Sequence, residues 1–138
     1  MIIDGTNLIV GRVGPVASKR ALEGETVDII NCERMVITGN KKDILAKYKT
    51  QDERGEKVHG PFLPKMPDRL VKRMIRGMLS YKKERGREAY KRIKCHIGVP
   101  VIFKDKKAET IAPANISKTK TLKYISVGDI SKYLGKKW

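Results

Sequence analysis

The spacing of apolar residues near the middle of the chain predicts one strongly two-sided helix. Six apolar residues recur there at offsets of three, four and one, which gathers them on one side of a helix over 67–79: Leu70, Val71, Met74, Ile75, Met78 and Leu79. Pro67 suits a first helical position, and Asp68 places an anion at the positive end of the helix dipole. Four cations fall on the opposite side, namely Arg69, Lys72, Arg73 and Arg76. The pattern therefore predicts a helix with a buried apolar face, including Met74 and Met78, and a cationic outer face.

Shorter apolar runs elsewhere predict strands that alternate with helices. We expect strands at 1–4, 26–31, 35–38, 95–103 and 122–125, with the fourth interrupted or ended at Pro100. Further helices are expected at 11–22, 41–49, 87–92 and after the capping residue Ser126 as far as 133–134. A turn at Gly86, an exposed loop at 50–59 and a turn-rich region at 104–121 complete the chain. This alternation predicts an α/β fold with a small, mainly parallel sheet, in one domain spanning residues 1–138.

The charge of the chain is large and unevenly distributed. The net charge is +16, with twelve basic and three acidic side chains between positions 65 and 96. The first 64 residues are almost neutral, with ten basic and nine acidic side chains. The remaining excess lies in a basic C-terminal region, about 104–138. A basic segment on an otherwise ordinary domain is typical of a nucleic-acid-binding surface.

Two other interpretations of the cationic face are weaker. An ordinary solvated face mixes both signs, yet no acidic residue occurs between Arg69 and Lys83. A membrane partner is disfavoured because no apolar run approaches the roughly 20 residues of a membrane span. We also expect no N-terminal signal segment before the strand at 1–4. Phe and Trp are absent from the apolar side of the helix, which favours burial over a lipid surface.

Metal, cofactor and catalytic sites are not indicated. Cys32 and Cys95 are widely separated, and we expect both to be reduced, intracellular thiols. His96 follows Cys95 directly, but neighbouring residues on a strand point to opposite faces, so a shared metal ion is not expected. Gly11 and Gly14 do not complete a phosphate-binding glycine motif.

A small nucleic-acid-processing enzyme is the alternative from a different functional class. Such an enzyme needs carboxylates that converge on metal ions, or a nucleophile with a base. Asp4, Asp28 and Glu33 lie near predicted strand ends but form no recognisable set. We therefore expect no catalytic residues, no metal, no cofactor and no small-molecule substrate.

Several sequence stretches resemble one family. Ile75-Arg76-Gly77-Met78-Leu79-Ser80 is followed by a basic turn, Arg85-Gly86-Arg87, and by Lys91-Arg92-Ile93-Lys94. With Asp4 before Gly11-Arg12, Asn31–Glu33 before Ile37-Thr38-Gly39, and Gly60-Pro61-Phe62, the whole chain resembles the large-subunit ribosomal protein L13 family. Gly60-Pro61-Phe62 and Gly98-Val99-Pro100, together with the short C-terminus, resemble archaeal members most.

This resemblance implies a three-layer α/β/α fold and a cytoplasmic protein of the large ribosomal subunit, next to other large-subunit proteins. It further implies direct rRNA binding early in assembly, and no catalytic activity. A translational regulator acting off the ribosome, known among some eukaryotic members, is the second alternative. From charge and position we assign rRNA binding to the helix face of Arg69, Lys72, Arg73 and Arg76, to the basic segment of Lys82, Lys83, Arg85, Arg87, Lys91 and Arg92, and to the additional contacts Lys41, Lys42, Arg12 and Lys65.

Overall fold

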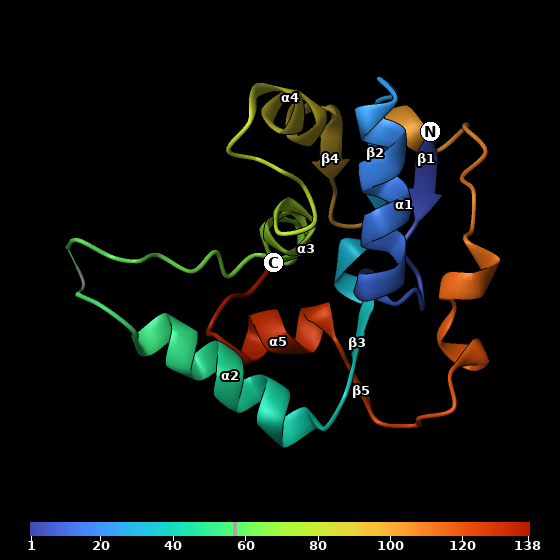
Figure 1. Ribbon diagram of the computed structural model, residues 1–138. Helices are drawn as coiled ribbons and strands as arrows, with labels where there is room; N and C mark the ends of the chain where they lie inside the picture. The colour runs from blue at the N-terminus through green and yellow to red at the C-terminus, as the bar shows by residue number, and fades with distance from the viewer. Residues whose placement is uncertain (57) are drawn as a thin grey trace.

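Helices and very short strands alternate along most of the chain (Figure 1). The computed structural model describes residues 1–56 and 58–138, and Lys57, within the predicted loop at 50–59, lies outside the described residues. The strands are β1 (Ile2–Asp4), β2 (Val27–Ile30), β3 (Val36–Thr38), β4 (Ile93–Cys95) and β5 (Tyr124–Ser126). The α-helices are α1 (Val10–Leu22), α2 (Lys41–Glu53), α3 (Pro67–Arg76), α4 (Glu84–Arg92) and α5 (Val127–Tyr133). Single 3-10 turns occur at Cys32–Arg34, Val101–Phe103, Ala112–Ala114 and Ile116–Lys118.

The strands form one parallel sheet and one separate antiparallel pair. In the parallel sheet β2 is central, with Ile3 paired to Ile29 on one side and Val27 paired to Ile93 on the other. The strands β3 and β5 pair antiparallel, with Ile37 opposite Ile125. The predicted α/β fold with a small, mainly parallel sheet is confirmed.

One continuous core joins the sheet to the helices. The sheet contributes Ile3, Ile29 and Ile93, none of which is exposed to solvent. The helix α1 presents small side chains inward, including Ala17 and Ala21, so that neighbouring elements approach it closely. The buried residues of α3 and α5 complete the same core: Leu70, Val71, Ile75, Val127 and Ile130. Because these side chains form one cluster, the chain is a single domain.

The predicted amphipathic helix is present but shorter than expected. The helix α3 ends at Arg76 rather than at residue 79, and the next residues form tight turns in which Met78 N–H donates to the Ile75 carbonyl. Leu79 stays buried, whereas Met78 is 41% exposed, so the prediction that Met78 is a core residue is wrong. Met74 is partly buried and packs against the core.

The prediction of a turn at Gly86 is also wrong. The helix α4 begins at Glu84 and contains Gly86 in its first turn, where this residue is buried. A Cβ atom at Gly86 would overlap the backbone carbonyl of Ser80, which passes directly beside the helix. Glycine is therefore required here by a close approach of two backbone segments and not by a change of chain direction.

Other element boundaries shift for tertiary reasons. The helix α2 continues four residues into the predicted loop at 50–59, as far as Glu53. The strand expected at 95–103 is β4 at Ile93–Cys95, because Ile93 pairs with Val27 in the core and Val101 lies in an exposed 3-10 turn. The predicted helix cap at Ser126 is confirmed, since its Oγ accepts a hydrogen bond from the Asp129 N–H at 3.0 Å.

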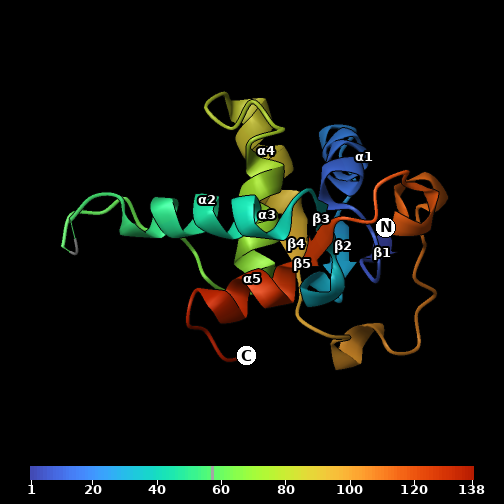
Figure 2. The same cartoon turned by 90° about the horizontal axis from the view of Figure 1, so that it is seen from below.

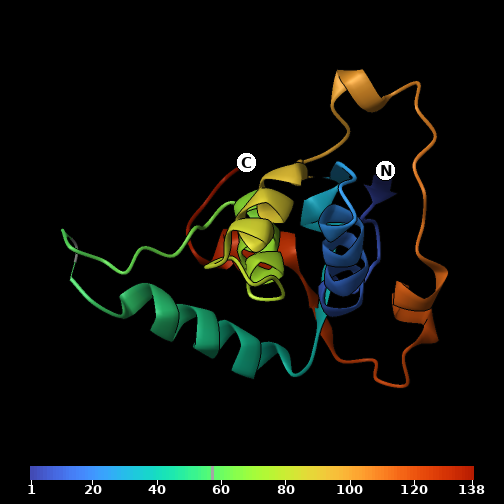
Figure 3. The ribbon, with the colours of Figure 1, turned by 45° about the horizontal axis from the view of Figure 1, so that its top comes forward.

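Two parts of the chain extend from the core on opposite sides. The helix α2 and the segment after it project on one side, and residues 97–121 form a wide excursion on the other (Figures 1, 2 and 3). The helix α2 has no fully buried residue, and it contacts the core through Ile44, Leu45 and Tyr48. The excursion returns along the outer edge of β1, where Asp4 N–H donates to the Glu109 carbonyl at 3.0 Å.

Candidate nucleic-acid interface

The helix α3 has the two faces that its sequence predicts. Leu70, Val71 and Ile75 face the core, while Arg69 and Arg73 are exposed and Lys72 and Arg76 are partly exposed. Within the described part of the chain, none of these four cations forms an ion pair with a carboxylate. Their positive charge is therefore not neutralised within the fold.

Aromatic rings and one carbonyl hold three of these cations in place. The Lys72 ammonium lies 5.0 Å from the centroid of the Tyr90 ring, and the Arg76 guanidinium lies 4.8 Å from that of Tyr81. Arg73 donates to the Phe62 carbonyl at 3.4 Å. Burial raises the pKa of Tyr90 above its ordinary value, although the nearby arginines act in the opposite direction. Cation–π contacts orient a charge without cancelling it, so these cations remain available to an anionic ligand.

In the basic segment after α3, four cations form no ion pair among the described residues, and two have a partner within the fold. Lys82, Lys83, Arg85 and Arg87 are exposed, and no ion pair involves them among the described residues. Two other predicted contacts have partners within the fold. Lys91 pairs with Glu88 at 2.9 Å, and Arg92 donates to the Ala21 carbonyl at 3.3 Å, which ties α4 to the end of α1.

The four additional candidates do not join this surface. Arg12 donates to the Pro113 carbonyl at 2.8 Å and so attaches α1 to the C-terminal excursion. Lys41 and Lys42 are exposed, but they begin α2, which extends away from α4 (Figures 1 and 3). Lys65 pairs with Asp52 at 2.8 Å.

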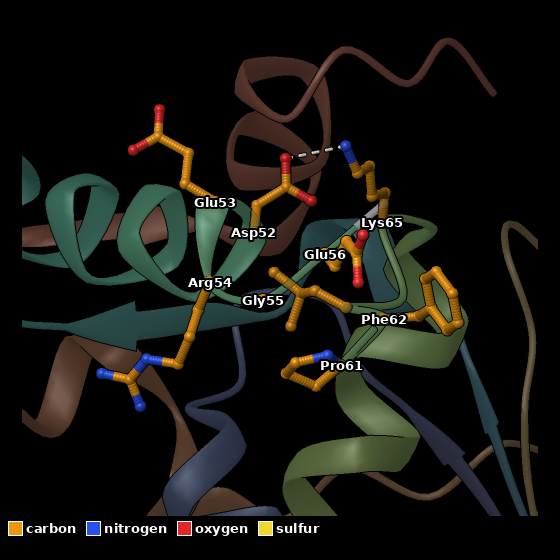
Figure 4. Close-up of a pocket in the computed structure, with 9 residues that line it drawn as sticks. Asp52, Glu53, Arg54, Gly55, Glu56, Pro61, Phe62 and Lys65 are labelled. Carbon is orange, nitrogen blue, oxygen red and sulfur yellow. Dashed lines mark hydrogen bonds and ion pairs between the residues drawn. The ribbon is translucent and has the colours of Figure 1, made fainter. Parts of the chain in front are cut away.

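Figure 4 shows that Lys65 lines a pocket together with acidic and basic side chains of the end of α2 and the segment after it. Its ammonium points toward Asp52, and the carboxylates of Glu53 and Glu56 also line the pocket, which has a volume of about 550 Å³. Arg54 lines the same pocket, so cations and carboxylates are mixed there, and Lys65 is not part of a purely cationic surface. No local pattern predicts the Lys65–Asp52 pair, because its members lie thirteen positions apart and α2 was expected to end before Asp52.

A second hollow lies between α1 and the turn that follows α3. It has a volume of about 460 Å³, and Lys19, Leu22, Met78 and Arg85 are among its lining residues. Lys19 and Leu22 were not predicted to take part in binding, because they lie more than 50 positions from the basic segment. The nearest signal in the sequence is Gly14, a glycine inside α1, where a Cβ atom would overlap the Met78 sulfur.

The polar groups considered for catalysis or metal binding have separate local partners. Asp4 accepts hydrogen bonds from Asn31 and Thr6, Asp28 contacts the His96 ring at 3.0 Å, and the Glu33 carboxylate accepts the Gly98 N–H at 3.0 Å. Among residues 1–56 and 58–138, no group of three or more His, Cys, Asp or Glu side chains has a geometry that would hold a metal ion.

The two cysteines are free thiols, and the buried Cys32 thiol donates to the Ile29 carbonyl at 3.4 Å. Cys32 follows β2, and Cys95 on β4 pairs with Ile29 of that strand, which brings the thiols together. The nearby Cys95 thiol, together with burial, raises the pKa of the Cys32 thiol above its ordinary value. Cys32 is therefore protonated and unreactive near neutral pH.

Comparison with known families shows which family the chain belongs to. The family model of Ribosomal protein L13 matches residues 1–101. The chain belongs to the ribosomal protein L13 family. The resemblance seen in the sequence is thus confirmed, and the chain is a ribosomal protein.

Relatives in the L13 family match almost the whole chain. The large ribosomal subunit protein uL13 of Methanosarcina barkeri is 43% identical over 138 residues, which covers 99% of both chains. The protein of the same name from Archaeoglobus fulgidus is 41% identical, covering 97% of this chain and 86% of its own length. That from Haloarcula marismortui is 39% identical, covering 98% and 90%. All three organisms are archaea, in agreement with the predicted archaeal type.

Across the described residues, no helix combines the length and the apolar character needed to cross a membrane.

Proposed function

We propose that the protein is a structural constituent of the large ribosomal subunit that binds large-subunit rRNA directly and supports early assembly. Its relatives are named as large-subunit proteins, and its partners would be large-subunit rRNA and neighbouring proteins of that subunit. In this proposal the protein has no catalytic activity. The separate local partners of Asp4, Asp28 and Glu33 support this, because each carboxylate is used within the fold.

The observation on which this proposal rests is the cationic face of α3. RNA presents closely spaced phosphates with condensed counterions, and cations that replace those ions gain entropy from their release. The backbone of α3 fixes the spacing of Arg69, Lys72, Arg73 and Arg76, and the tyrosine rings restrict Lys72 and Arg76 further. Less conformational freedom is then lost on binding.

The exposed cations after α3 extend this surface. Lys82 and Lys83 lie in the turns between α3 and α4, while Arg85 and Arg87 lie in the first turn of α4. Arginine forms bidentate contacts with phosphate and stacks on unpaired bases, whereas lysine acts as a point charge. Folded RNA is recognised mainly by shape, 2′-hydroxyls and unpaired bases, so an irregular surface of this kind suits it.

Direct binding is tested with the purified full-length chain and protein-free large-subunit rRNA from Methanosarcina barkeri. We expect binding without any other ribosomal protein. The logarithm of the binding constant should fall by about 0.7 to 0.9 per phosphate contact for each tenfold increase in salt concentration.

Co-sedimentation with large subunits through a high-salt gradient tests residence in the particle. Stable binding to RNA without co-sedimentation would favour a regulator acting off the ribosome. Cleavage of labelled RNA in the presence of magnesium would favour an enzyme.

A further inference from the structure

The hollow between α1 and the turn after α3 combines apolar walls with a cationic rim. Leu22 on α1 is 37% exposed and Met78 on the turn is 41% exposed, although both are large apolar side chains. Pro15 adds to the apolar wall, while Lys19 and Arg85 line the same hollow. Its volume of about 460 Å³ lies within the range of small-molecule sites, about 300–1,000 Å³.

The hollow depends on a close approach of the Met78 side chain to α1 at Gly14. The Met78 side chain packs directly onto Gly14, where any larger residue would displace it. This contact holds the thioether beside α1 instead of leaving it free in solvent. The hollow is thus a defined feature of the fold, although Met78 itself keeps three rotatable bonds and can adapt to a ligand.

The polar groups of the hollow distinguish between possible ligands. Glu23, an exposed residue at the end of α1, also lines the hollow, and its carboxylate would repel a phosphate placed beside it. Ser18 also lines the hollow; the residue is 4% exposed, and its hydroxyl oxygen is buried and has no hydrogen-bond partner among the described residues. A ligand with a flat apolar surface and hydrogen-bonding edges fits this set, provided that its negative charge stays at the rim.

We propose that this hollow binds one unpaired nucleotide of the RNA, with its base against Leu22 and Met78 and its phosphate paired with Arg85 and Lys19. This inference rests on the proposed function and names a specific site within it. A thioether packs favourably against an aromatic ring, and sequence-specific contacts to RNA are made mainly with bases that are splayed out of the helix. The Ser18 hydroxyl and the Glu23 carboxylate would meet the polar edge of the base once the side chains of the hollow rotate to admit it.

The first test uses the full-length chain labelled with ¹³C at its methionine methyl groups. It is titrated separately with the four nucleoside 5′-monophosphates, with ribose 5-phosphate and with inorganic phosphate. We expect the Met78 methyl resonance to move saturably with at least one nucleotide, in the direction produced by an aromatic ring current, and not with the two probes that lack a base. The methyl resonance of Met66, which does not line the hollow, is the internal control. A Met78 resonance that ignores nucleotides, or that responds equally to inorganic phosphate, overturns the proposal.

The second test compares the same substitution at two leucines, one that lines the hollow and one that lies elsewhere. Leu22→Ala removes an apolar wall of the hollow, whereas Leu122→Ala removes the same atoms from a side chain that is 93% exposed elsewhere. We expect Leu22→Ala to weaken binding to protein-free large-subunit rRNA at least fivefold and Leu122→Ala to change it less than twofold, with unchanged circular dichroism. Equal binding by both variants overturns the inference. Absence of rRNA binding by the unmodified chain instead refutes the proposed function, and the nucleotide titration still reports on the hollow.

Discussion

The guanidinium of Arg76 lies over the ring of Tyr81, 4.8 Å from its centroid. Arg76 is the last residue of α3, and Tyr81 belongs to the turns that follow it. The contact therefore connects the ordered cationic helix to the basic segment after it. It orients one face of the guanidinium against the ring and leaves the charge without a carboxylate partner.

Replacing two arginines of α3 should separate RNA binding from stability. In the double variant Arg73→Gln/Arg76→Gln, we expect the logarithmic salt slope of rRNA binding to fall by roughly 1.5, because two phosphate contacts are lost. The free energy of unfolding should change by no more than about 1 kcal/mol, since only a cation–π contact and a long hydrogen bond disappear. Lys106→Gln/Lys107→Gln removes the same charge from the C-terminal excursion and serves as the control. Unchanged affinity together with lost thermal stability would show that the arginines are structural.

The two methionines near the end of α3 should differ in their contribution to stability. Met74 packs against the core, and its sulfur accepts a hydrogen bond from the Tyr48 hydroxyl of α2 at 3.7 Å. We expect Met74→Ala to reduce the free energy of unfolding by about 1–2 kcal/mol, below the 2–5 kcal/mol of a fully buried site. Met78→Ala should reduce it by less than about 1 kcal/mol. Urea unfolding monitored by circular dichroism gives both values, and the reverse order would contradict the burial described here.

Two helical glycines should respond oppositely to the same substitution. At Gly86 a new methyl group would overlap the Ser80 carbonyl, so Gly86→Ala should lower the free energy of unfolding by about 2 kcal/mol or more. At Gly11, in the first turn of α1, nothing lies within 4 Å of the corresponding position. Gly11→Ala should therefore stabilise the protein by about 0.5–1 kcal/mol, through the higher helix propensity of alanine. Thermal and urea unfolding measure both changes, and a neutral Gly86→Ala would show that the two backbone segments separate easily.

Asp4 should make stability depend on pH in the acid range. Burial by itself raises the pKa of Asp4, but hydrogen bonds from Asn31 and Thr6 outweigh it, so the pKa lies below its ordinary value of 3.8. Because the folded state holds this proton less tightly than the unfolded state, the stabilisation is present above about pH 4 and is lost as the pH falls toward the folded pKa. We expect the difference in unfolding free energy between the native chain and Asp4→Asn to shrink from pH 5 to pH 2.5. A difference that stays constant across this range would assign the effect to other carboxylates.

Features set by local periodicity were predictable from the sequence. The apolar and cationic sides of α3 follow from residue spacing alone, and Leu70 and Arg69 lie where the pattern places them. The cap at Ser126 is equally local, because its partner is only three residues away. The exposed cations of α3 and the following basic segment could therefore be placed on a surface before the fold was known.

Features set by contacts between distant segments were not predictable. Gly86 has the composition of a turn residue, and only the Ser80 backbone beside it explains why a helix contains it. The ion pair of Lys65 with Asp52 likewise depends on the path of the chain between α2 and α3. The antiparallel pairing of β3 with β5 joins two short apolar runs that carry no sign of their partner.

The return of residues 109–116 along β1 determines when the sheet is complete. Glu109 exchanges backbone hydrogen bonds with the first strand, Ile116 N–H donates to the Asn7 carbonyl, and β3 acquires its partner only with β5. Translation proceeds from the N-terminus, so the outer edge of β1 stays unpaired until residues 109–116 have been synthesised. A chain that ends at residue 101 contains the three strands of the parallel sheet, yet lacks the backbone that pairs with the outer edge of β1. The native pairing of the outer edge of β1 therefore requires residues 109–116, and that of β3 requires β5.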